Sequence, residues 1–202
     1  MSQYLVSKLV ELGAIQFDFE DGFVYASGKK GPVYCDTRKI IGDPLIRNIF
    51  VDALVEKVKQ LGKADAFGAM ATGAISLGAL VADRLNLPFF YVRSSTKEYG
   101  KNNQIEGLNE NGFGDKKVIL FEDLINSGGS VLKGANALKS AGFTLTNILS
   151  LVDYNFSNAN EALRSICPVN SLIKFEDILD SISDEQMEEK NKLVSWHKEF
   201  YN

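Results

Sequence analysis

The segment from Val118 to Ser130 constrains the fold of this chain more than any other stretch. Its first four residues are apolar and predict a strand that is buried on both faces of a parallel sheet. Glu122 and Asp123 follow at the carboxyl end of that strand, where open α/β sheets bind their ligands. Clustered backbone N–H groups at a helix N-terminus attract anions, so the turn that comes next predicts a sugar-phosphate site. That turn, which leads into the helical pattern of residues 131–141, consists of Asn126, Ser127, Gly128, Gly129 and Ser130.

The same segment excludes two common nucleotide-binding motifs. It lacks the Gly-Lys-Ser/Thr ending of a Walker loop, and its glycines do not follow the Gly-x-Gly-x-x-Gly spacing of a dinucleotide-binding turn. Taken singly, its parts have simpler interpretations, because adjacent acidic residues are often a solvated loop and a Gly-Gly pair is often only a turn. Their occurrence together, after a buried strand, favours a binding site.

Composition restricts the kind of protein that this chain can form. It has 202 residues, 45% of them hydrophobic, which is enough for one domain with a full core. A net charge of −4 argues against a nucleic-acid partner, which needs a basic face. Cys35 and Cys167 lie far apart, and the single His197 cannot complete a zinc site with them. Since neither a signal segment nor a membrane-spanning apolar run is recognisable, we expect a reduced, cytoplasmic protein without a membrane partner.

Hydrophobic periodicity and turn signals predict alternating helices and strands. The predicted order begins with a helix over 3–12, a hairpin of 14–19 with 23–26, a strand over 33–38, and a helix over 43–61. Strands over 64–70, 88–93, 118–121, 144–153 and 171–175 then alternate with helices over 75–85, 131–141 and 158–166. Ser183 with Gln186 predicts a capping box for a final helix. The fold class is therefore α/β in a single domain, 1–202. It comprises a small β-rich hood (1–40), a parallel-sheet core flanked by helices (43–175) and a C-terminal helix (183–202).

Two further segments supply candidate site residues. In the small-residue turn after the strand at 64–70, the backbone of Ala71, Thr72 and Gly73 can approach an anion closely. Tight strand–helix packing is the simpler explanation of this turn. Residues 94–115 are too many for an idle connection in a compact domain. Because they include Lys97 and Tyr99, they predict a cationic lid over a reacting centre, with a solvated loop as the alternative.

Three segments resemble motifs of one enzyme family. Phe121 to Ser130 resembles the phosphoribosyl diphosphate (PRPP) motif of type I phosphoribosyltransferases. Arg93 to Gly107, with its lysine, its Tyr-Gly pair and its closing Ile-Glu-Gly, resembles the flexible catalytic loop of orotate phosphoribosyltransferases. The pattern Phe23-x-x-x-Ser27-Gly28-x-x-x-Pro32-x-Tyr34-x-Asp36-x-Arg38 is similar to the amino-terminal loop of the same branch. The turn at 71–73 matches the family's diphosphate-binding turn, so the resemblance extends from Phe23 to Asp153.

The resemblance implies the type I phosphoribosyltransferase fold, with a hood and a flexible catalytic loop. It implies transfer of the phosphoribosyl group from PRPP to orotate with Mg²⁺ as the cofactor, and Lys97, Glu122 and Asp123 as the catalytic residues. The two carboxylates are expected to orient the ribose hydroxyls, directly or through Mg²⁺, while residues 126–130 bind the 5-phosphate. Residues 71–73 are expected to bind the diphosphate, together with Arg93, Lys97 and Tyr99. Family members are typically homodimers whose lid lysine reaches the neighbouring subunit, so we expect a homodimer.

The departures from the family pattern concern mainly the base. Ala26 and Ser94 stand where the family usually has lysines, and Asn126 replaces a common threonine. Tyr154 occupies the position of an arginine that contacts the orotate carboxylate in the family. The residues that the resemblance implies for PRPP binding are therefore mostly present in this chain, whereas those implied for base binding are mostly replaced.

The base site accordingly has several candidates. Lys29 or Lys30 is the nearest cation in sequence for the orotate carboxylate. Transfer to a different base, a PRPP-sensing regulator that binds nucleic acid, and a structural α/β domain are alternatives to the orotate enzyme. The lid lysine and the acidic net charge argue against the regulator, and four motifs in register argue against a structural domain. The candidates for base binding, with Tyr34 expected to stack on the ring, are Tyr34, Cys35, Asn126 and Tyr154.

Overall fold

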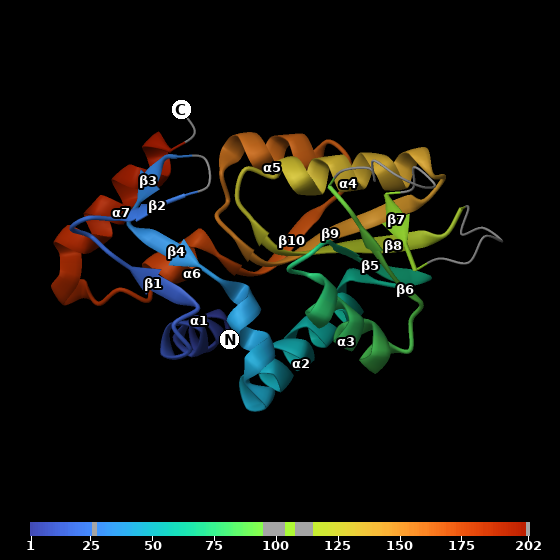
Figure 1. The fold of residues 1–202 in the computed structure, drawn as a ribbon, viewed down its shortest axis with the longest axis horizontal. Helices are drawn as coiled ribbons and strands as arrows, with labels where there is room; N and C mark the ends of the chain where they lie inside the picture. The colour runs from blue at the N-terminus through green and yellow to red at the C-terminus, as the bar shows by residue number, and fades with distance from the viewer. Residues whose placement is uncertain (26–27, 95–103, 108–114, 201–202) are drawn as a thin grey trace.

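A six-stranded sheet forms the centre of the computed structural model, which describes residues 1–25, 28–94, 104–107 and 115–200 (Figure 1). The helices are α1 (Ser2–Glu11), η1 (Thr37–Gly42, a 3-10 helix), α2 (Pro44–Leu61), α3 (Ile75–Leu85), α4 (Gly129–Ser140), α5 (Ser157–Arg164), α6 (Phe175–Leu179), η2 (Asp184–Gln186, a 3-10 helix) and α7 (Met187–Glu199). The strands are β1 (Ile15–Phe17), β2 (Phe23–Val24), β3 (Lys30–Gly31), β4 (Val33–Cys35), β5 (Ala66–Met70), β6 (Phe89–Val92), β7 (Ile105–Glu106), β8 (Lys117–Ile125), β9 (Thr144–Asp153) and β10 (Val169–Lys174).

The central sheet has the strand order β10-β9-β8-β5-β6-β7, in which the first five strands are parallel. Strand β7 pairs antiparallel with β6, with Tyr91 opposite Glu106. The predicted α/β core with a parallel sheet is confirmed, and the short antiparallel strand β7 adds to its edge. Two residues of the polar segment 94–115 return to the sheet edge because Ile105, 6% exposed, contributes its side chain to the core.

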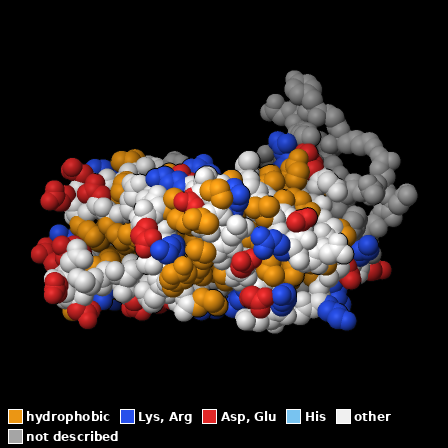
Figure 2. All heavy atoms as spheres, turned by 90° about the horizontal axis from the view of Figure 1, so that it is seen from below, with side chains coloured by type: hydrophobic (Ala, Val, Ile, Leu, Met, Phe, Trp, Pro, Cys, Tyr) orange, Lys and Arg blue, Asp and Glu red, His pale blue; other side chains and the backbone are white. Residues whose placement is uncertain are grey.

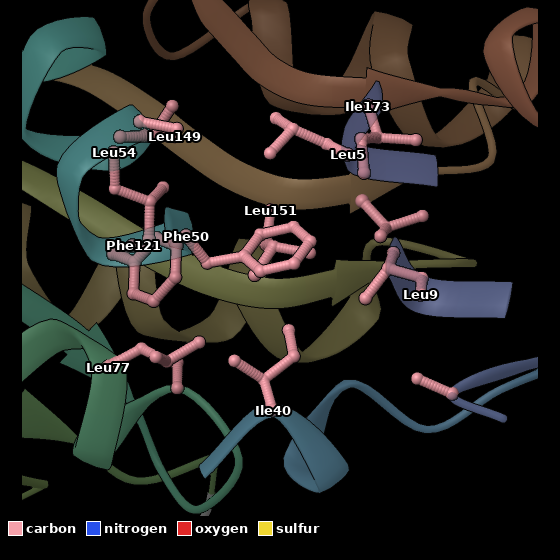
Figure 3. Close-up of a cluster of buried hydrophobic side chains, with 14 of the residues drawn as sticks. Leu5, Leu9, Ile40, Phe50, Leu54, Leu77, Phe121, Leu149, Leu151 and Ile173 are labelled. Atoms are coloured by element: carbon pink, nitrogen blue, oxygen red, sulfur yellow. The ribbon is translucent and has the colours of Figure 1, made fainter. Parts of the chain in front are cut away.

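The period of two along each buried strand creates two cores. Alternate residues of β8, Val118 and Leu120, face the side covered by α4 and α5, whereas Ile119 and Phe121 face the side covered by α1, α2 and α3 (Figure 1). Figure 3 shows side chains of the core on the α1, α2 and α3 side, which converge from these helices, from η1 and from the strands. A strand that is apolar on both faces is therefore covered on both faces by helices, as the sequence predicts.

The hood pairs differently from the prediction. Residues 14–19 and 23–26 do not form a hairpin with each other: β1 pairs with β4, and β2 pairs with β3. A local turn decides the second pairing, because the N–H of Tyr25 donates to the carbonyl of Lys29 at 2.9 Å. The Asp18 carboxylate separately accepts from the N–H groups of Glu20 and Asp21, so this acid caps a bend that turns the chain away from β1.

The C-terminal part also differs in detail. Ser183 precedes η2 but its side chain makes no capping bond to the backbone, so the predicted capping box was wrong. The α-helix begins only at Met187 and packs against the hood, where the rings of Trp196 and Phe200 contact Tyr25. In the described part of the chain no helix is both long enough and apolar enough to cross a membrane.

Candidate active site

A cavity of about 400 Å³ lies at the carboxyl ends of β5 and β8, where the pairing between these two strands ends. Pairing between these strands ends at Ala69 and Phe121, but β8 continues alongside β9 as far as Ile125. Glu122 and Asp123 therefore lie inside β8, in the part of the strand that extends beyond β5. The sequence had suggested that they follow the strand. Three segments line the cavity: the start of η1, the turn after β5, and β8 with the start of α4. The lining residues are Cys35, Asp36, Thr37, Arg38, Ala71, Thr72, Gly73, Glu122, Asp123, Leu124 and Ser130.

The carboxylate of Asp123 is held from two sides. The hydroxyl of Thr37 donates to Asp123 Oδ2 at 2.6 Å. On the other side Gly73 lies so close that a β-carbon there would collide with the same carboxylate. The turn at 71–73, which contains a cis peptide bond between Ala71 and Thr72, thus has a glycine where the acid needs the space.

Glu122 is the more deeply buried of the two acids, at 6% exposed. Its Oε1 accepts the N–H of Asp123 at 3.1 Å, and its Oε2 accepts the hydroxyl of Ser130 at 3.3 Å. Burial, a hydrogen bond shared with the Asp123 side chain and the charge of that neighbour raise the pKa of Glu122 to about 9. Glu122 therefore keeps its proton at neutral pH.

A divalent cation fits this pair only with ligands from elsewhere. Among the described residues, no three His, Cys, Asp or Glu side chains come together as a metal site. Two adjacent carboxylates beside an open cavity suit a hard cation whose other ligands are oxygens of a bound substrate and water. The donor set is thus compatible with Mg²⁺ held mainly by a polyanionic ligand.

Arg38 is the cation among the described lining residues. Its Nε donates to Asp36 Oδ1 at 2.6 Å, and this ion pair lowers the pKa of the Asp36 carboxyl. The guanidinium is largely exposed, since its side chain keeps 64% of its accessible area. Lys29, which we expected to serve as a cation for the base, instead donates to the carbonyl of Phe200 at 2.5 Å. With Lys30 it lines a separate cavity beside α7, so the expectation for these two lysines was wrong.

The second predicted anion-binding element is the start of α4. Gly128 has φ of +72°, and no described side chain caps the start of the helix, which leaves its first N–H groups available to an anion. A β-carbon on Gly128 would also press against Ala159 and Leu163 of α5. The residue is therefore required twice, for the left-handed turn and for helix packing. Of the turn residues 126–130, only Ser130 lines the cavity itself.

The remaining predicted residues lie around the cavity or outside the described residues. Arg93 directly follows β6 and pairs with Glu106 of β7, Nη1 to Oε1 at 3.4 Å, while Tyr91 donates to the same carboxylate at 2.7 Å. This arginine does not line the cavity. Lys97 and Tyr99 of the predicted lid, and Ala26 of the hood, lie outside the described residues.

The candidates for base binding are only partly brought together. Cys35 lines the cavity, and burial together with the charges of Asp123 and Asp36 raises the pKa of its thiol to about 12. Tyr34 is 38% exposed and lies against Phe23, with ring centroids 5.6 Å apart. Tyr154 is buried at 3% exposed in the aromatic cluster around Trp196, so its ring supports the hood.

Four residues that line the cavity had no role assigned from the sequence: Asp36, Thr37, Arg38 and Leu124. The Tyr-x-Asp-x-Arg pattern indicated that the segment 34–38 matters for function, but it did not indicate which residues the segment contacts. Thr37 is the residue that the pattern leaves unspecified, and its hydroxyl reaches an acid 86 positions later in the chain.

Comparison with known proteins agrees with this geometry. The model of the phosphoribosyl transferase domain family matches residues 42–172. The orotate phosphoribosyltransferase of Bacteroides thetaiotaomicron is 38% identical over 205 residues, which cover 98% of this chain and 95% of that protein. The enzyme of the same name from Oceanobacillus iheyensis is 34% identical over 203 residues, covering 98% and 99% of the two chains.

Solved structures give the same result. The crystal structure of orotate phosphoribosyltransferase from Aeropyrum pernix matches with a TM-score of 0.72 at 30% identity, covering 87% of this chain and 97% of that one. Leishmania donovani UMP synthase matches with a TM-score of 0.77 at 22% identity, over 96% of this chain and 42% of that chain. At that lower identity the second match supports the fold alone.

The protonated state of Glu122 makes stability depend on pH in a defined direction. Unfolding lowers its pKa from about 9 to the ordinary 4.5, so the native state binds the extra proton between these values and loses stability as pH rises through them. We expect Glu122→Gln to exceed the wild type in free energy of unfolding by about 1–3 kcal/mol near pH ~8. The difference should shrink towards pH ~5 in urea titrations. Glu56→Gln on exposed α2 is the control, and a pH-independent difference at Glu122 would rule out the shifted pKa.

Proposed function

This chain belongs to the orotate phosphoribosyltransferase family, and we propose that it transfers the phosphoribosyl group of PRPP to orotate. The products are orotidine 5′-monophosphate and diphosphate, a step of pyrimidine biosynthesis. The observation that carries the proposal is the carboxylate pair of β8 beside the turn at 71–73 and the uncapped start of α4. Such a site offers acids for ribose hydroxyls and backbone N–H groups for two anionic ends of one ligand.

Each part of PRPP has a proposed partner in this arrangement. Residues 126–130 at the start of α4 bind the 5-phosphate, and residues 71–73 bind the diphosphate. Glu122 and Asp123 bind the ribose hydroxyls, which lie between the two anionic groups of the substrate. Arg93 and the lid residues Lys97 and Tyr99 add charge and a hydrogen bond at the diphosphate. Mg²⁺, held mainly by substrate oxygens with Glu122 and Asp123, supplies charge neutralisation to the diphosphate.

The chemistry at the ribose explains why positioning residues dominate this site. The ring nitrogen of orotate displaces diphosphate at C1 of the ribose with inversion, and departure of the leaving group leads. Negative charge then grows on the diphosphate, where the cationic side chains and the N–H groups at 71–73 stabilise it. The ring nitrogen of orotate is acidic, so the site needs no strong general base. The residues of this chain mainly bind, orient and exclude water.

The direct test of the proposal is the loss of orotate absorbance on adding PRPP and Mg²⁺. We expect turnover by the wild type, and a loss of a few powers of ten in Lys97→Ala without a change in the unfolding midpoint, as is typical for a transition-state charge contact. A signal with adenine, uracil or another base, and none with orotate, would move the assignment to that base. Near wild-type turnover in the variant would remove Lys97 from the catalytic role.

Arg38 is our candidate for the cation that recognises the orotate carboxylate. Tyr154 supplies no charge at the position where the family has an arginine, whereas Arg38 lines the cavity next to Cys35. Asp36 binds its Nε, which orients the guanidinium and, among the described contacts, leaves the two terminal nitrogens for a carboxylate. An arginine held in this way suits a bidentate pair.

Substitution of Arg38 separates the two substrates. Arg38→Leu should raise the KM for orotate by about 10–100-fold, the range for losing a hydrogen-bonded charge contact, with a much smaller rise for PRPP. Arg164→Leu is the matched control, because Arg164 is exposed at the end of α5, on the other face of the sheet. An unchanged KM for orotate contradicts the assignment, and equal rises for both substrates would place Arg38 at the diphosphate instead.

We also propose that the enzyme is a homodimer in which the lid segment of one subunit serves the site of the other. Apolar side chains are exposed on the face formed by α1, α2 and α3, which Figure 2 shows from below. Tyr4 is 52% exposed and Leu45 is 78% exposed there, a composition that supports association. Both cysteines are free thiols, which supports a reducing cytoplasmic setting for this dimer.

Mixing two inactive variants tests the shared site. Lys97→Ala and Asp123→Asn homodimers each lack one part of every site. A heterodimer has one site with both residues intact if the lid crosses between subunits. Subunit exchange should then restore about a quarter of wild-type turnover, because half of the dimers are mixed and each has one good site. No recovery after verified exchange, or a monomer in sedimentation, contradicts the shared site.

A further inference from the structure

Thr37 makes a hydrogen bond that joins the hood to the carboxylate pair of the core. Its hydroxyl donates to Asp123 Oδ2 at 2.6 Å, a short distance that is typical of a bond from a neutral hydroxyl to a charged carboxylate. Thr37 is only 2% exposed although it lines the cavity, so its side chain is enclosed by protein. A bond shielded in this way is little weakened by water.

The backbone around Thr37 fixes the direction of this hydroxyl. Asp36 caps η1, since its carboxylate accepts the N–H of Arg38 at 3.3 Å. Ile40, three residues further along η1, is fully buried in the core beneath the sheet (Figure 3). Threonine is branched at Cβ and has few side-chain rotamers. The anchored 3-10 helix therefore presents the hydroxyl to Asp123 in one orientation.

The surroundings of Asp123 leave it dependent on such a partner. Gly73 presses against one side of the carboxylate without offering a side-chain donor. The neighbouring acid, Glu122, uses its oxygen atoms to accept the N–H of Asp123 and the hydroxyl of Ser130. Among the described side chains, Thr37 is the neutral donor that the recorded bonds assign to Asp123.

We propose that Thr37 is a positioning residue for PRPP: its hydroxyl holds the Asp123 carboxylate in the orientation that receives the ribose hydroxyls. This inference rests on the proposed function, because it assumes that Asp123 binds the ribose. Thr37 acts through Asp123 and does not itself react. It also links ligand binding to the docking of the hood, since η1 is the segment that leads from the hood strands into α2.

Two substitutions at position 37 separate positioning from packing. Thr37→Val keeps the shape and removes the hydroxyl, and we expect it to weaken PRPP binding about 10–100-fold in calorimetry with Mg²⁺ and without a base. In turnover assays the KM for PRPP should rise more than kcat falls. Thr37→Ser restores the donor and should return the affinity to within about threefold of the wild type. Thr146→Val, which removes a half-buried hydroxyl bound to the Val118 carbonyl far from the cavity, is the control for general effects.

A double-mutant cycle with Asp123→Ala tests the route of the effect. If Thr37 acts through Asp123, Thr37→Val has no further effect on PRPP affinity once the acid is gone. An additive loss overturns the proposal, as does wild-type affinity in Thr37→Val with an unchanged unfolding midpoint. PRPP binding is measured without orotate, so a failure of orotate transfer with intact PRPP binding refutes the proposed acceptor and leaves the role of Thr37 to be judged by the cycle.

Discussion

The burial of Glu122 next to Asp123, in the part of β8 that extends beyond β5, is the constraint on which the site depends. Burial and the neighbouring Asp123 raise the pKa of Glu122 to about 9, so Glu122 keeps its proton at neutral pH. The surrounding structure stabilises that arrangement through the hydroxyl of Ser130 on one acid and the hydroxyl of Thr37 on the other. A ligand with hydroxyl groups between two anionic ends is complementary to such a pair, since its hydroxyls donate and its anions reach the N–H groups on either side.

Sequence alone predicted the scaffold that creates this position. The apolar run at 118–121 required a strand covered on both faces, and the small-residue turns required strand–turn–helix connections that bring backbone N–H groups to one edge of the sheet. Helix α3 at Ile75–Leu85 and strand β9 at Thr144–Asp153 have the predicted bounds. These features depend on the local hydrophobic pattern, which can be read from a single sequence, and on general rules of sheet topology.

What sequence could not supply are contacts between distant segments. The hood strands alternate too briefly for the pattern to choose partners, and in the structure a bond from the Tyr25 N–H to the Lys29 carbonyl continues the pairing of β2 with β3. Thr37 and Asp123 are 86 positions apart, and only the fold brings them together. Likewise, the ring of Tyr154 packs edge-on against Phe156 and Trp196, whereas its place in the sequence indicated only that the family's arginine was missing. Lys29 illustrates the same limit, because nearness in sequence suggested a role that its bond to Phe200 contradicts.

The most direct test of the central claim is a calorimetric titration of PRPP, with Mg²⁺ and without any base, into the wild type and into Asp123→Asn. The account predicts saturable binding of one PRPP per chain in the wild type and affinity at least about tenfold weaker in the variant, since the variant loses the charged partner of the ribose hydroxyls. Equal affinity in the two proteins would contradict the account, because PRPP would then bind without the carboxylate pair.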